Sequence, residues 1–263
     1  MAHAAAGELV DEGLDRRVRA VDRNHVRMPD VLFLPGFMQH ADAWSEVAAV
    51  VGERYPSRVL DFSTWTFEER LTEIRAAAQP AAVLVGYSMG GRLALHAAFR
   101  EDARYSGVVM VGGTAGIEDD ASRARRRDAD RELAAWIEAH SIEEVVARWE
   151  GNPVFASQPP ELVATQRAGR LRHDPRDLAT LLRSAGQGAL PSLWGRLGEL
   201  RIPVLALAGE YDVAYRAAGE KLATAGPVFA AAVVEGAGHA AHLEQPRAVA
   251  DAILAFVEGS TRP

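Results

Sequence analysis

The sequence contains no cysteine, only one lysine (Lys221) and no long apolar run. The missing cysteine excludes disulfide bonds, thiolate metal ligands and cysteine nucleophiles. No apolar run approaches the roughly 20 residues that a membrane-spanning helix needs. With a single lysine, 29 − 1 = 28 of the basic residues are arginine, a bias that GC-rich coding explains for most of them.

The composition that remains is that of a globular chain. Its 263 residues are 48% hydrophobic and 25% charged, enough for one α/β domain with a sizeable core. The net charge of −7 and a pI near 5.7 argue against non-specific binding to nucleic acid or anionic membranes. The opening MAHAAAGELVDEGLDRR carries acidic residues and no continuous apolar segment, so we expect no signal peptide and a cytoplasmic protein.

Short apolar runs alternate with helical patterns along the chain, as in a mostly parallel sheet whose strands are joined by crossover helices. Because the runs are almost continuously hydrophobic, we expect the sheet to be buried on both faces. The predicted strands are 30–36, 57–63, 81–88, 106–113, 202–210 and 229–239. The predicted helices are 41–52, 67–78, 89–100, 214–225 and 244–258.

Residues 115–195 break this alternation, because they read as helices without a strand between them. We therefore predict an α/β core made of 28–114 and 196–263, with 115–195 as a helical lid. Such a lid would lie over the carboxyl edge of the sheet, where open α/β sheets bind their ligands. Residues 1–27 form an N-terminal extension whose structure the sequence leaves open.

The segment GYSMG places Ser88 between Gly86 and Gly90, after a predicted strand and before a predicted helix. This is the G-x-S-x-G pattern in the strand–turn–helix context that a nucleophilic serine requires. A sharp turn of this kind forces the serine into a strained backbone conformation and leaves no room for side chains two positions away. The alternative is a glycine-rich turn selected for packing alone.

A serine nucleophile needs a base, and the base needs an acid that orients it. In the order typical of this turn, Asp212 and His239 follow Ser88, and each comes just after its own predicted strand. We therefore predict a Ser88–His239–Asp212 triad. Glu210 is the alternative acid and His242 the alternative base, and Asp212 has the further alternative of capping the next helix.

Two backbone N–H groups are the expected donors of an oxyanion hole. One belongs to Met89, directly after the serine, and the other to Phe37, in the loop after the first predicted strand. Because backbone donors require no particular side chain, these two assignments depend on position alone.

At this point the chain resembles the α/β-hydrolase superfamily over residues 28–258. Within it, several segments are similar in order and spacing to the MenH family of the menaquinone pathway. They are GYSMGGRLALHAA, RRRDADRELAAWIE, VVARWEGNPVFASQ, LRHDPRDLATLLRSAGQGALPSLW and GAGHAAHLEQP. The resemblance implies an α/β-hydrolase fold and a lyase that eliminates pyruvate from a succinylated, enolpyruvyl-bearing cyclohexene carboxylate.

The resemblance also implies substrate-binding residues. Arg92, Arg126 and Arg170 match the family's carboxylate-binding arginines, and a guanidinium fork suits a carboxylate. Trp149 matches an aromatic residue of the pocket, and Tyr87 adjoins the serine. The residues alone leave other roles open: a solvated helix face for Arg126, a salt bridge at a helix start for Arg92 and lid core for Trp149.

The implied partner is a small anionic organic substrate, and the implied reaction requires no cofactor and no metal. Two loops depart from the family pattern and leave the exact substrate open. The first reads Pro35-Gly36 where His-Gly is usual, followed by the bulky Met38-Gln39-His40. The second, DFSTWTFEERL from Asp61, lacks the usual glycines.

Two other functions remain open. A serine hydrolase, acting as an esterase, a thioesterase or a carbon–carbon bond hydrolase, would use the same triad. A non-catalytic binding protein of the same fold is the third possibility, although such proteins usually lose a triad member and this chain keeps all three.

Overall fold

The computed structural model describes residues 28–260, so the predicted extension 1–27 lies outside the described residues. Six parallel strands form one sheet in the order β2-β1-β3-β4-β5-β6. The strands are β1 (Val31–Leu34), β2 (Ser57–Val59), β3 (Ala82–Tyr87), β4 (Tyr105–Val111), β5 (Val204–Gly209) and β6 (Phe229–Val234). All six lie within the predicted ranges or within one residue of them.

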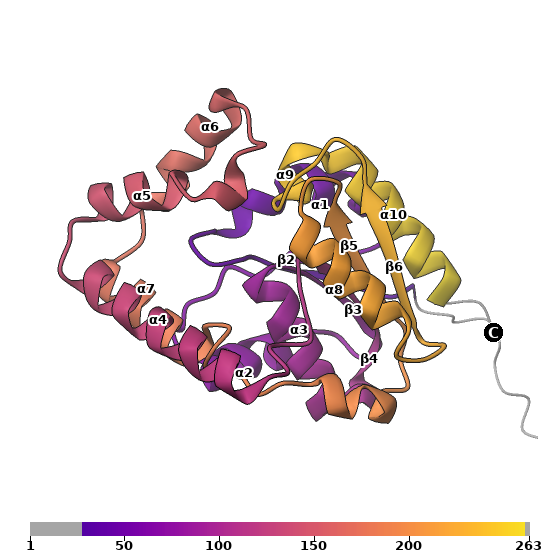
Figure 1. The fold of residues 1–263 in the computed structure, drawn as a ribbon. Coiled ribbons are helices and arrows are strands. Elements are labelled where there is room, and N and C mark those ends of the chain that lie inside the picture. The colour runs from indigo at the N-terminus through magenta and orange to yellow at the C-terminus, as the bar shows by residue number, and fades with distance from the viewer. Residues whose placement is uncertain (1–27, 261–263) are drawn as a thin grey trace, which may run out of the picture.

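Helices cover both faces of the sheet (Figure 1). One face packs against α1 (Ser45–Gly52) and α10 (Pro246–Ser260), and the other against α2 (Phe67–Ala77), α3 (Met89–Arg100) and α8 (Val213–Ala223). Alternate residues of β1 show why the run is continuously apolar. Val31 and Phe33 belong to the core on the α1 side, whereas Leu32 and Leu34 belong to the core on the α3 side. The predicted parallel sheet, buried on both faces by helices, is therefore confirmed.

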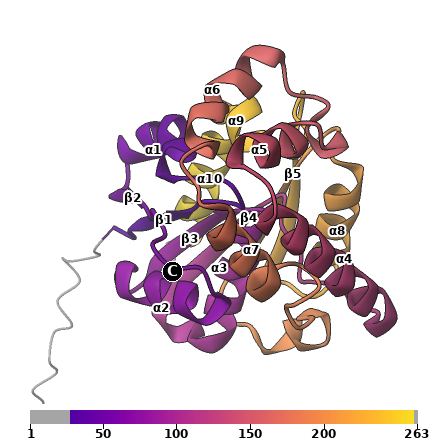
Figure 2. The same cartoon turned by 90° about the vertical axis from the view of Figure 1, so that its left-hand side faces the viewer.

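Four helices lie between β4 and β5 and form a lobe beside the sheet (Figures 1 and 2). They are α4 (Asp120–Glu138), α5 (Ile142–Glu150), α6 (Pro160–Arg170) and α7 (Pro175–Ala185). Helix α7 joins this lobe to the core, where the Ser184 hydroxyl accepts a 2.7 Å hydrogen bond from the Phe67 N–H. The exact division into core and lid stays a prediction.

Sequence reading missed two details near the end of the chain. The run predicted as strand 229–239 ends at Val234, because Gly236 adopts a φ of +67° and turns the chain. The last predicted helix, 244–258, corresponds to α10 (Pro246–Ser260), and the short helix α9 (Ala241–Glu244) before it was not predicted as a separate element. The short 3-10 helices are Ala41–Trp44, Asp102–Arg104, Pro153–Phe155 and Trp194–Glu199. No helix within residues 28–260 has both the length and the apolar character that crossing a bilayer requires.

Candidate active site

Ser88 lies at a strained turn between β3 and α3. Its backbone has φ +48° and ψ −105°, a conformation that non-glycine residues rarely adopt. The flanking glycines are needed because neighbouring backbone passes very close. A Cβ atom on Gly86 would lie 2.3 Å from the Gly90 carbonyl, and one on Gly90 would lie 2.2 Å from the Leu34 oxygen. The turn therefore presents the serine at the carboxyl edge of the sheet.

His239 connects Ser88 to Asp212. Its Nδ1 lies 2.6 Å from Asp212 Oδ2, and its Nε2 lies 3.2 Å from Ser88 Oγ. A carboxylate only accepts hydrogen bonds, so Nδ1–H donates to Asp212 and Nε2 of the neutral ring accepts the serine proton. Asp212 and His239 are each 6% exposed, so this interaction is shielded from water. The structure thus brings the three predicted residues together.

The structure gives the two alternative residues other partners. Glu210 accepts the Gly236 N–H at 2.9 Å and shapes the loop before His239. His242 lies in α9 and contacts Gln39 rather than an acid. Asp212 does occupy the position before α8, but its side chain makes no capping hydrogen bond.

The two predicted oxyanion donors lie at the positions expected from the sequence. Met89 begins α3 directly after Ser88, and Phe37 follows Gly36 in the loop after β1. This loop is pressed against the serine turn, because a Cβ atom on Gly36 would lie 2.5 Å from the Tyr87 ring. Within residues 28–260, neither the Phe37 nor the Met89 N–H has a hydrogen-bond partner. Both donors are therefore free to bind an oxyanion, although that role stays a prediction.

Arg92 is a buried cation one helical turn beyond the serine. Its backbone N–H donates to the Ser88 carbonyl at 3.1 Å. The residue is 6% exposed, and the Nε atom of its side chain has no hydrogen-bond partner among the described residues. No ion pair to Arg92 occurs in the described part of the chain. Burial is the main cause that lowers the pKa of this guanidinium; neighbouring Arg126 also lowers it, whereas Tyr215 and Asp130 act in the opposite direction. An unpaired buried guanidinium is costly, and the predicted role of Arg92 in binding a substrate carboxylate stays a prediction.

The other two predicted arginines already have carboxylate partners. Arg170 is 4% exposed and contacts Glu150 at 3.1 Å, and burial lowers its pKa. Arg126 is half exposed and contacts the buried Asp130 at 2.7 Å. Only Arg92 of the three is free of an acidic partner within residues 28–260.

Aromatic side chains from the lobe close over the His239 ring. Trp149 meets Phe37 edge-on at 5.2 Å and Phe155 at 5.6 Å, and Phe155 lies 6.4 Å from the His239 ring. From the core, Tyr215 approaches that ring to 4.6 Å. The predicted pocket residue Tyr87 lies 5.3 Å from it, and burial raises the Tyr87 pKa well above its ordinary value. Sequence reading missed both Tyr215, which lies outside the segments that resemble the family, and Phe155, which lies in VVARWEGNPVFASQ but was not singled out there.

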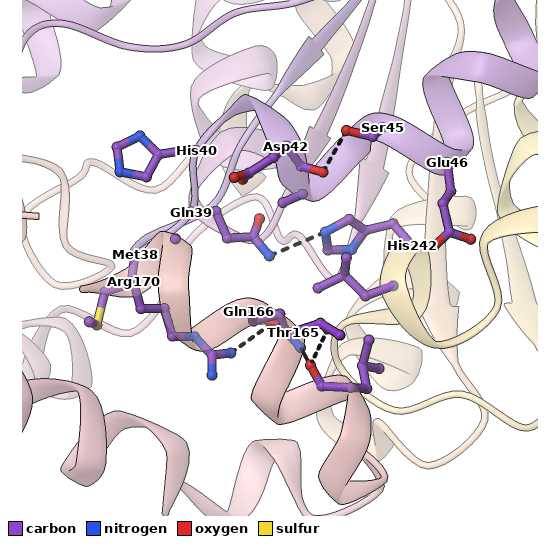
Figure 3. A pocket seen from close by; sticks show the side chains of 14 residues that line it. Met38, Gln39, His40, Asp42, Ser45, Glu46, Thr165, Gln166, Arg170 and His242 are labelled. Carbon is purple, nitrogen blue, oxygen red and sulfur yellow. Dashed lines mark hydrogen bonds between the residues drawn. The ribbon is translucent and has the colours of Figure 1, made fainter. Parts of the chain in front are cut away.

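Two cavities lie on either side of Met38. The larger, of about 290 Å³, is lined by Trp149 and other side chains of α4 and α5. The second, of about 250 Å³, lies between the loop after β1, α6 and α9 (Figure 3). In Figure 3, Gln39 and His242 point toward one another, and Arg170 points toward Gln166. The lining of neither cavity includes Ser88, which is itself partly exposed.

Glu244 is a further residue of the site that sequence reading did not identify. Its carboxylate accepts the Gly238 N–H at 2.8 Å and the Ala240 N–H at 3.1 Å, so it grips the backbone on both sides of His239. The hydroxyl of Ser157, from the lobe, donates to the same carboxylate at 2.8 Å. The sequence signals were its place five residues after His239 and its position within the segment GAGHAAHLEQP. Among the described residues, no group of three or more His, Asp or Glu side chains is arranged to hold a metal.

Two curated relatives carry the same activity in their names. A protein of Bacillus subtilis (strain 168), named putative 2-succinyl-6-hydroxy-2,4-cyclohexadiene-1-carboxylate synthase, is 37% identical over 177 residues, which cover 66% of this chain and 65% of that protein. A synthase of that name from Salmonella heidelberg (strain SL476) is 35% identical over 170 residues, covering 65% of this chain and 66% of the relative. The chain thus matches just under two thirds of each relative's length.

Solved structures extend the likeness over most of the fold. MenH from S. aureus superposes with a TM-score of 0.83 at 28% identity, covering 91% of this chain and 97% of that one. A thermophilic esterase from Thermogutta terrifontis superposes with a TM-score of 0.75 at 20% identity, covering 89% and 91%, and so shares the fold. These comparisons confirm the resemblance that the sequence motifs indicated. The profile of the alpha/beta hydrolase family matches residues 31–252, and the chain belongs to that family.

Proposed function

We propose that this chain is a lyase that forms 2-succinyl-6-hydroxy-2,4-cyclohexadiene-1-carboxylate by eliminating pyruvate in menaquinone biosynthesis. The names of the relatives support this product, and the residues around Ser88 support the chemistry. The substrate is a small organic anion, and the expected location is the cytoplasm. No cofactor or metal enters the proposed reaction.

In the proposed reaction, His239 draws the Ser88 proton, and the serine oxygen removes a proton from the ring carbon next to the succinyl ketone. The Phe37 and Met89 N–H groups hold the negative charge that develops on the ketone oxygen. The electron pair then forms a ring double bond as the C–O bond to the enolpyruvyl group breaks. The departing enolate takes up a proton and becomes pyruvate. Asp212 keeps the imidazole in the required tautomer and stabilises its cation.

The environment of Arg92 is the observation that most strongly supports an anionic substrate. Its guanidinium is buried, has no acidic partner among residues 28–260 and lies one turn from Ser88. A site built for a neutral ester gains nothing from such a cation, whereas a carboxylate repays its burial with charged hydrogen bonds. Tyr215, which packs on His239, is an electrostatic neighbour of Arg92, which supports a position close to the reacting atoms.

A serine hydrolase is the second candidate, and the pairing of two arginines favours it. A tri-anionic substrate would have to displace Glu150 from Arg170 and Asp130 from Arg126, or bind in addition to them. A hydrolase with an uncharged substrate needs neither exchange.

Pyruvate release tests the two candidates. Purified protein is incubated with the enzymatically generated precursor, and pyruvate is measured against the spontaneous background. We expect release that Ser88→Ala abolishes, and that Arg92→Ala lowers by at least about tenfold in kcat/KM, because a charged hydrogen bond contributes about 1.5–3 kcal/mol. Arg247→Ala is the matched control, since that arginine is 73% exposed on α10.

The outcomes separate cleanly. Serine-dependent release well above background, sensitive to Arg92 but not to Arg247, supports the lyase. No release from a protein that still cleaves an activated ester through Ser88 refutes it and leaves the hydrolase.

A further inference from the structure

The loop after β1 makes a strained turn at the place where Phe37 offers its N–H. The Gln39 N–H donates to the Gly36 carbonyl at 3.3 Å, which closes a turn around Phe37 and Met38. Met38 has a φ of +58°, in the left-handed region that costs a non-glycine residue of order 1–3 kcal/mol. A strained turn persists only if its surroundings hold it, so the contacts of this turn decide where the Phe37 N–H points.

The side chain of Gln39 closes the same turn a second time. Its Oε1 accepts the Gly36 N–H at 3.1 Å, and its Nε2 lies 3.3 Å from His242 Nε2 (Figure 3). The Gly36 N–H can only donate, so it fixes the carboxamide oxygen on its own side. The amide NH₂ must therefore face His242 and donate to it. Both ends of the carboxamide are used, one inside the turn and one on α9.

His242 is a rigid anchor for that amide. It is 1% exposed and lies between the rings of Trp44, at 4.5 Å, and Tyr87, at 4.2 Å. To accept from Gln39, its Nε2 must carry no proton. Burial, and after it the neighbouring His239, lower the His242 pKa to about 3, so the ring stays neutral at physiological pH. A neutral imidazole has one acceptor nitrogen, and the Gln39 amide selects the tautomer in which that nitrogen is Nε2.

We propose that Gln39 is the positioning residue of the oxyanion loop: its carboxamide ties the Gly36 N–H to His242 and so fixes the Phe37 N–H toward Ser88. The proposal rests on the proposed use of Phe37 as an oxyanion donor. It also gives a physical role to a bulky residue that departs from the family's usual loop. Gln39 acts through the backbone and does not touch the reacting atoms.

The test replaces Gln39 by methionine, which keeps the length of the side chain and removes both hydrogen bonds. One readout is the rate at which a fluorophosphonate modifies Ser88, because the phosphoryl oxygen must enter the oxyanion hole. The other readout is kcat and KM for pyruvate release. Thr165→Val is the matched control. Thr165 lies on α6 and lines the same cavity as Gln39, and among residues 28–260 its hydroxyl donates only to the Leu162 carbonyl.

We expect Gln39→Met to lower the phosphonylation rate and kcat by at least about tenfold with KM unchanged, because losing one oxyanion donor outright costs about 10²–10³ in kcat. His242→Phe should have a similar effect, and the double variant should be no slower than the slower single variant, because the two residues act as one unit. Thr165→Val should match the wild type. Melting temperatures show that each variant is folded.

Unchanged phosphonylation in a folded Gln39→Met protein overturns the inference, and so does a raised KM with unchanged kcat, which would make Gln39 a substrate contact. Additive effects of the two substitutions also overturn it. If the wild type releases no pyruvate but Gln39→Met still slows phosphonylation, the proposed function fails and the positioning role stands.

Discussion

Acidification should unfold this protein through three buried histidines. His96, His173 and His242 are 8%, 7% and 1% exposed. Burial is the main cause that lowers their pKa values, to about 4, about 4 and about 3. In the unfolded chain each would titrate near its ordinary value of 6.5.

The sign follows from proton uptake. Below pH 6.5 the three histidines bind protons in the unfolded chain but not in the folded protein. The free energy of unfolding therefore falls as the pH falls, until each histidine is also protonated in the folded state. Between pH 6.5 and the pKa of the folded state, each histidine lowers the free energy of unfolding by about 1.4 kcal/mol per pH unit. Three together remove about 4 kcal/mol per unit, or about 8 kcal/mol by pH 4.5. That loss is comparable with the whole stability of a typical domain, about 5–15 kcal/mol.

Urea unfolding at a series of pH values between 7.5 and 4.5 measures the slope directly. His96→Leu isolates one contribution. The His96 ring packs edge-on against Phe67 at 5.2 Å. Burial is the main cause that lowers the His96 pKa, and the charges of Arg92 and Arg100 lower it further. We expect this variant to lose about a third of the pH slope between 6.5 and 4.5, whatever its stability at pH 7.5.

A flat stability between pH 7 and pH 5 would refute the reasoning, because it would mean that the three imidazoles are protonated in the folded protein. If His96→Leu leaves the pH dependence of the free energy of unfolding unchanged, only the third of that slope assigned to His96 is refuted.

Two further substitutions test the site's architecture. Arg92→Met should raise the free energy of unfolding by about 1–3 kcal/mol, because it removes a buried, unpaired cation, while it lowers kcat/KM for the anionic precursor by at least about tenfold; a loss of stability in urea unfolding would contradict this. Gly90→Ala should cost at least about 3 kcal/mol, since its Cβ would lie 2.2 Å from the Leu34 oxygen. Gly195→Ala, with no atom within 4 Å of its Cβ, is the control and should stay within about 0.5 kcal/mol of wild type by calorimetry.

The sequence predicted the sheet and the serine turn well because both depend on local signals. Continuous apolar runs mark strands buried on two faces, and Gly86 and Gly90 mark a turn that excludes side chains. The order of Ser88, Asp212 and His239, each after its own strand, was enough to predict that they meet. Parallel strands bring their carboxyl ends to one edge.

Contacts between distant segments could not be predicted in this way. Gln39 and His242 are 203 residues apart, and nothing in either local pattern indicates the other. The pairing of Arg170 with Glu150 depends on how α5 and α6 pack. Sequence similarity marked Arg170 as a substrate contact, whereas the structure shows the carboxylate with which a substrate would have to compete.

The lobe's two ends meet at one point of the core. The Leu193 N–H donates to the Ala115 carbonyl at 2.8 Å, and the Trp194 indole N–H donates to the Gly116 carbonyl at 2.9 Å. The inserted segment between β4 and β5 therefore leaves and rejoins the core at one place, which these two hydrogen bonds hold together. Doubling the length of such an excursion costs only about 0.6 kcal/mol of closure entropy. The segment between these two hydrogen bonds can therefore change in length and sequence, and with it the substrate that is bound, without a change in the serine turn.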